Sequence, residues 1–147
     1  MQVKKIICPT DFSDASRKAM DYAIYMQNMF NAELVIVHVV FDESSLITMY
    51  VPQATMHGFL AEMQVGAQGL LDEFLTNCEQ LKGVKYTTKL LKGSPHEELL
   101  KYADEISADM IVIGTNGRTG IEHALFGSTA EKVVSRAKCP VLTVRPD

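Results

Sequence analysis

The chain has 147 residues, of which 47% are hydrophobic and 22% charged, a composition that predicts one soluble globular domain over 1–147. Its formal net charge of −4 argues against nucleic acid as the main partner, because duplex binding requires a basic face. No apolar run reaches the length of a secretory signal or of a membrane span, so we expect a cytoplasmic protein with no membrane partner.

Strand-like and helix-like segments alternate from the start of the chain. A short apolar strand is predicted over 3–8, before Pro9 breaks the pattern. Apolar residues at steps of three and four predict an amphipathic helix over 14–30, and the β-branched run 33–40 predicts a buried strand. The mixed segment 42–56 predicts a loop.

The same alternation continues to the end of the chain. At the start of one helix, Ser94 and Glu97 form the pattern of a capping box, with Pro95 at the first helical position. Such alternation indicates an α/β fold with a mostly parallel sheet of five strands and helices on both faces. The remaining elements are expected as a helix over 58–81, a strand over 85–91, a helix over 94–106, a strand over 110–114, a helix over 127–137 and a strand over 141–145.

The glycine-rich segment 114–129 is the strongest candidate for a binding site. Ligands of open parallel sheets lie beyond the carboxyl ends of the strands, where this segment begins. Glycine lets the backbone approach a ligand closely, and free amides at the helix start near Gly127 favour phosphate. The hydroxyls of Ser128 and Thr129 can add hydrogen bonds. A glycine-rich connection with a Gly–Ser cap remains the structural alternative.

The sequence contains neither of two well-known glycine-rich nucleotide-binding motifs. The spacing is neither that of a P-loop nor that of a Rossmann dinucleotide fingerprint, which disfavours a P-loop kinase and a dehydrogenase. Segment 114–132 has two basic and two acidic residues and is locally neutral. We therefore expect backbone amides, hydroxyls and a divalent ion, rather than lysine, to hold the phosphates.

Five motifs in register resemble those of the universal stress protein family. The spacing Gly114-x-x-Gly117, nine residues, then Gly127-Ser128 matches the G-2x-G-9x-G-[ST] motif of its ATP-binding branch. The other four motifs are 8–13 (CPTDFS), like the family's V-P-x-D-x-S opening; 37–40 (VHVV), like its H-V segment; 93–97 (GSPHE), like its G-x-P turn; and 139–144 (CPVLTV), like its C-P-V-L-x-V ending.

The resemblance implies a Rossmann-like sheet of strand order 3-2-1-4-5, a homodimer formed through the last strand, and ATP bound with Mg²⁺. Asp11 would contact the ribose or help to hold the phosphate-bound Mg²⁺. From its place in the loop, Arg118 can reach the phosphates, and an exposed loop arginine is the alternative. The other implied roles are Pro9, Thr10 and Val39 lining the adenine pocket, Ile113 and Gly114 near the nucleoside, and Gly117, Gly127, Ser128 and Thr129 around the phosphates.

These observations favour an ATP-binding stress-response regulator whose nucleotide state alters a dimer surface or the surface for an unidentified protein partner. A nucleotide-independent interaction module and an adenine-nucleotide hydrolase are the alternatives. No catalytic residue is assigned, so at most slow ATP hydrolysis is expected. His38 fits a hydrogen-bonded core histidine, and Cys8, Cys78 and Cys139 fit buried or partly buried thiols.

Overall fold

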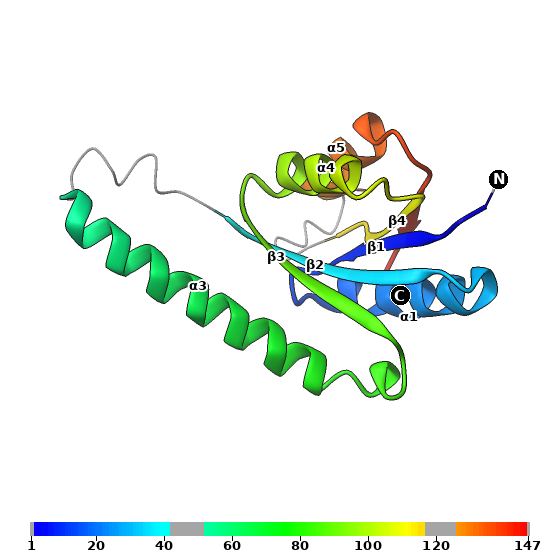
Figure 1. The fold of residues 1–147 in the computed structure, drawn as a ribbon. Helices are drawn as coiled ribbons and strands as arrows, with labels where there is room; N and C mark the ends of the chain where they lie inside the picture. The colour runs from blue at the N-terminus through cyan, green and yellow to red at the C-terminus, as the bar shows by residue number, and fades with distance from the viewer. Residues whose placement is uncertain (1, 42–51, 117–125, 147) are drawn as a thin grey trace.

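A computed structural model describes residues 2–41, 52–116 and 126–146 of the chain. The strands and helices of these ranges alternate as the sequence predicts (Figure 1). The strands are β1 (Lys5–Pro9), β2 (Glu33–Phe41), β3 (Tyr86–Gly93), β4 (Met110–Gly114) and β5 (Val141–Val144). The helices are α1 (Asp14–Phe30), α3 (Gln53–Thr76), the short 3₁₀ helix η1 (Glu79–Leu81), α4 (Pro95–Glu105) and α5 (Ser128–Arg136).

All five strands form one parallel sheet in the order β3-β2-β1-β4-β5, which confirms the expected topology. The strand order reverses between β1 and β4, and parallel sheets of this kind bind ligands at the carboxyl edge of such a reversal. β2 extends past β1: it pairs with β3 as far as Phe41↔Gly93, but with β1 only as far as Pro9↔Val37. The far end of β2 is therefore open on its β1 side.

Helices cover both faces of the sheet, as predicted, because the buried strand residues alternate between the two faces. On β1, Ile6 and Cys8 pack with α1 and the second half of α3, whereas Ile7 packs with α4 and α5. Figure 1 shows α4 and α5 on one side of the sheet and α1 with α3 on the other.

Helix α1 coincides with its predicted range because both of its ends are specified locally. Ser13 is the N-cap, and its hydroxyl accepts a hydrogen bond from the Ser16 amide at 3.3 Å. Asn31 follows in the left-handed conformation, with φ of 53°, and its amide donates to the Gln27 carbonyl.

Three local predictions are wrong. Residues 53–56 belong to α3, which begins directly after Pro52 and ends at Thr76, so the predicted loop is shorter and the helix starts earlier. Pro9 is the last residue of β1, so this strand ends one residue later than predicted. The Ser94 capping box does not form, because the Ser94 hydroxyl lies 3.2 Å from Nδ1 of His96 and makes no side-chain cap.

Candidate functional site

A cavity of about 830 Å³ lies at the carboxyl edge of the sheet, where β1, β2 and β4 end. The β1–α1 turn and the start of α5 form two of its walls, α3 forms another, and α4 contributes Pro95 and Leu99. Such a volume is in the range of small-molecule and cofactor pockets.

All but two of the sequence-predicted site residues line this single cavity. The two exceptions, Gly117 and Arg118, lie outside the described residues. The lining residues that the sequence predicts are Pro9, Thr10, Asp11, Val39, Ile113, Gly114, Gly127, Ser128 and Thr129. Segments that are far apart in the sequence therefore meet at the place where the strand order reverses.

Hydroxyl and carboxylate groups hold the β1–α1 turn in one shape. The Thr10 hydroxyl lies 3.0 Å from the Ser16 hydroxyl and accepts a hydrogen bond from the Phe12 amide at 3.1 Å. The Asp11 carboxylate accepts from the Ser13 amide at 3.0 Å and from the Ser13 hydroxyl. These bonds place Asp11, half-buried, on the cavity wall.

Phe12 within this turn has an unusual backbone, with φ of 70°. The left-handed region costs a bulky residue about 1–2 kcal/mol, so surrounding contacts must hold Phe12 there. Its ring packs against His38 at a centroid distance of 4.3 Å and against Phe74 at 5.3 Å. Nδ1 of His38 lies 2.7 Å from the Thr10 carbonyl oxygen, which confirms the hydrogen-bonded histidine, although His38 also lines the cavity.

The two described glycines of the motif have different structural roles. A Cβ atom on Gly114 would lie 2.8 Å from the carbonyl carbon and oxygen of Ala15, so this glycine permits β4 to pack closely against α1. Gly127 has an extended backbone, with φ of −72°, and its amide donates to the Thr115 carbonyl at 2.5 Å. The Gly127 amide is thus engaged within the protein and is not one of the amides free to bind a phosphate.

The start of α5, which lines the cavity, has amides without an acceptor inside the helix. The first hydrogen bond of this helix runs from the Glu131 amide to the Gly127 carbonyl at 3.0 Å, and no side chain caps the helix start. The amides of Ser128, Thr129 and Ala130 consequently have no acceptor within the helix. Together with the positive end of the helix dipole they favour an anion. The cavity wall, as far as the structure describes it, includes no lysine or arginine.

Comparison with known proteins identifies the family. The model of the universal stress protein family matches residues 2–145. The chain belongs to the universal stress protein family. Universal stress protein MJ0531 of Methanocaldococcus jannaschii is 38% identical over 143 residues, which cover 97% of this chain and 82% of the relative.

Solved structures of the family share the fold. The structure of MJ0577 from M. jannaschii superposes with a TM-score of 0.82 at 26% identity, covering 100% of this chain and 99% of that one. A universal stress protein solved in complex with cAMP superposes with a TM-score of 0.68 at 25% identity, covering 98% of each chain.

Two buried polar atoms within the glycine motif of this universal stress protein have no hydrogen bond to the described residues. They are Oγ1 of Thr115 and Oδ1 of Asn116, and neither has a partner among the described residues. Both residues line the cavity directly after β4, and Thr115 is only 2% exposed. Buried polar groups without partners are rare in native proteins, so these two point to a ligand. The sequence analysis did not select them, although both stand inside the glycine motif.

The wall formed by α3 was also missed. Met63, Gly66, Ala67 and Leu70 line the cavity from this helix, and Phe41 joins them from the end of β2. These residues give one side of the cavity an apolar surface, which suits a flat aromatic base. The sequence showed that these residues recur at helical spacing. It did not show that their helix lies beside the cavity.

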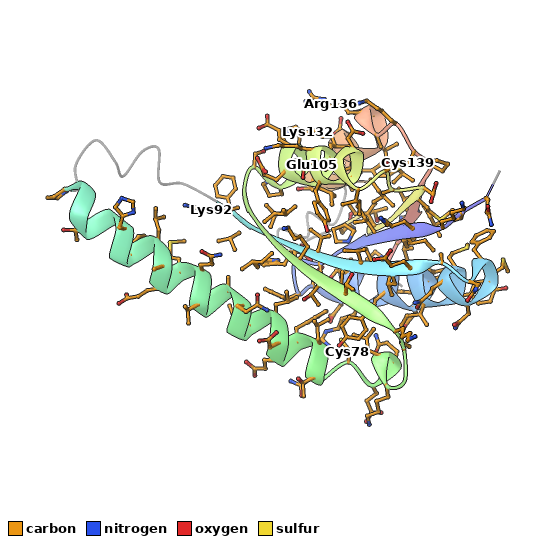
Figure 2. All side chains as sticks on the ribbon, in the orientation of Figure 1. Cys78, Lys92, Glu105, Lys132, Arg136 and Cys139 are labelled. Atoms are coloured by element: carbon orange, nitrogen blue, oxygen red, sulfur yellow. The ribbon has the colours of Figure 1, made fainter. Side chains whose placement is uncertain are left out.

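The cysteines are free thiols, as predicted. Burial raises the pKa of Cys8 to about 12, and burial also raises the pKa values of Cys78 and Cys139. Cys78 and Cys139 lie on opposite faces of the sheet (Figure 2).

The described residues contain no cluster of three or more His, Cys, Asp or Glu side chains that could hold a metal ion, and none of their helices is long and apolar enough to cross a membrane.

Proposed function

We propose that this universal stress protein binds ATP in the cavity at the carboxyl edge of its sheet, and that nucleotide binding alters a dimer or partner surface. The uncapped amides at the start of α5 carry the proposal, because they open into a cavity that also has an apolar wall. The relative solved with cAMP supports an adenine nucleotide as the class of ligand.

The open end of β2 supports recognition of the adenine edge. The Val37 carbonyl accepts from the Thr10 amide at 2.8 Å, so Val37 directs its backbone groups toward β1. In a strand the direction repeats every second residue, so Val39 faces the same side. β1 has already ended at that level, which leaves the amide and the carbonyl of Val39 facing the cavity. This carbonyl can accept a hydrogen bond from the amino group of adenine.

The other cavity residues divide between nucleoside and phosphates. Pro9 and Thr10 lie beside Val39 on the adenine side, and Ile113 and Gly114 lie at the end of β4, where the nucleoside would pass. In this arrangement the amides of α5 and the hydroxyls of Ser128 and Thr129 bind the phosphates. Gly127 contributes by holding the start of α5 against Thr115.

Asp11 is the one acidic residue on the described cavity wall, and its carboxylate suits either a ribose hydroxyl or Mg²⁺. Mg²⁺ in nucleotide sites is commonly held by one or two carboxylates together with phosphate oxygens and water, so a single aspartate fits that mode. When bound, the ion would offset phosphate charge. The described wall offers no second carboxylate.

A second copy of the chain is the proposed partner in the assembly. β5 is an edge strand, paired with β4 on one side, and its residues Val141, Leu142 and Thr143 are only half-buried. Edge strands of this kind are templates for pairing with another chain.

Isothermal titration calorimetry tests the proposed ligand. ATP should bind more tightly than GTP, because guanine carries an acceptor where adenine carries the donor that the Val39 carbonyl accepts. Mg²⁺ should strengthen ATP binding, and Asp11→Asn should remove most of that gain. Equal ATP affinity with and without Mg²⁺ would take the metal out of the site, and absence of ATP binding in both conditions would refute the proposal.

A further inference from the structure

Thr115 carries a buried hydroxyl that has no partner among the described residues. The residue is 2% exposed, and its Oγ1 atom has no hydrogen bond to any described residue. A buried hydroxyl in this state loses its bonds to water and receives none in return. Because Thr115 also lines the cavity, a ligand bound there can supply the missing bond.

The backbone of Thr115 is fixed on both sides. Its amide donates to the Val144 carbonyl at 2.9 Å, and its carbonyl accepts from the Gly127 amide at 2.5 Å. The second bond joins Thr115 directly to the N-cap residue of α5. Gly114 faces α1, so in the alternation of the strand Thr115 faces the opposite side of the sheet, on which α5 packs.

We infer that Thr115 is a further phosphate-recognition residue, whose hydroxyl donates to the anion held by the uncapped amides of α5. This inference rests on the proposed function and assigns to the same site a residue at a position that the G-2x-G-9x-G-[ST] pattern leaves unspecified. A hydroxyl donor suits the position, because phosphate oxygens only accept hydrogen bonds and a charged acceptor gives the stronger bond. Thr115 therefore distinguishes phosphorylated ligands from the bare nucleoside.

Calorimetric titration of Thr115→Val with ATP and with adenosine separates recognition from structure. Valine has nearly the shape of threonine but no donor, so ATP affinity should fall about tenfold or more while adenosine affinity stays at the wild-type value. Thr115→Ser, which keeps the hydroxyl, should retain ATP affinity within about threefold. Thr88→Val is the matched control, since Thr88 lies exposed on β3 and away from the cavity, and it should change neither affinity.

Thermal unfolding without ligand supplies a second readout. Thr115→Val removes a buried hydroxyl that has no partner, so the melting temperature should stay level or rise even though ATP binding weakens. Unchanged ATP affinity in Thr115→Val would overturn the inference, as would a parallel loss of ATP and adenosine binding.

Inorganic tripolyphosphate separates this inference from the proposed function. If the wild-type protein binds no adenine nucleotide, the proposed function fails. Tripolyphosphate that binds the wild type and not Thr115→Val would still support the phosphate subsite, whereas its failure to bind the wild type would refute the subsite as well.

Discussion

Gly114 and Gly127 belong to one sequence motif, yet they have different roles in the described structure. At Gly114 the requirement is steric, because the backbone of Ala15 occupies the place where a Cβ atom would be. Gly127 has an ordinary extended φ, and its described role is the hydrogen bond that ties the start of α5 to Thr115. The close packing that Gly114 permits at the end of β4 is therefore a contact with α1.

Gly114→Ala tests this steric role. The added methyl group meets backbone atoms that cannot rotate away, so we expect a loss of about 1–3 kcal/mol in the free energy of unfolding. Gly69→Ala is the control, because a Cβ atom there meets nothing within 4 Å and alanine favours a helix interior by about 0.5–1 kcal/mol. Urea denaturation measures both changes. Equal stability of the two variants would show that β4 and α1 separate easily.

Much of the candidate site could be predicted because its residues follow strand ends or begin a helix, and these features have sequence signatures. The strained φ of Phe12 has none, since phenylalanine does not favour that region and tertiary contacts, including those with His38 and Phe74, hold it there. The unpaired hydroxyl of Thr115 likewise depends on which groups the fold places around it. Such features follow from tertiary packing, which local patterns do not contain.

Helix α3 has two dissimilar halves. Its second half packs on the sheet through Leu71, Phe74 and Leu75, whereas Phe59 and Val65 in the first half are exposed. In Figure 1 the first half of α3 extends beyond the sheet. Exposed apolar residues and internal glycines blur the helical pattern, which explains why the sequence placed the start of this helix too late.

The neighbours Leu70 and Leu71 lie on different faces of α3 and should differ in what they contribute. Leu71→Ala removes a fully buried side chain from the core and should lower the free energy of unfolding by about 2–5 kcal/mol. Leu70 is 55% exposed and lines the cavity, so Leu70→Ala should cost only about 0.5 kcal/mol and should instead weaken ATP binding. Urea denaturation and calorimetry measure the two effects. Similar losses of stability would mean that both faces of α3 are packed.

At the scale of the whole molecule, the alternation of strands and helices is sufficient to predict a parallel sheet covered on both faces. Prediction of the strand order required the family resemblance, because alternation of strands and helices alone allows several strand orders. That order places the ends of β1 and β4 side by side and brings residues 9–11 together with 113–116 and the start of α5. The candidate site is therefore a consequence of topology.

The same topology leaves β5 at an edge, and hydrogen exchange can show whether a second copy covers it. Residues alternate along β5 in the direction of their backbone groups, so the amides that point away from β4 face no strand of the described monomer and should exchange rapidly. In a dimer paired along β5 these amides become protected, and their protection should rise with protein concentration. Amides that form hydrogen bonds between the central strands β1 and β4 serve as the internal control, because their exchange rates should not depend on protein concentration. Outward-facing β5 amides that exchange rapidly at every concentration, in a protein that sediments as a dimer, would place the interface elsewhere on the surface.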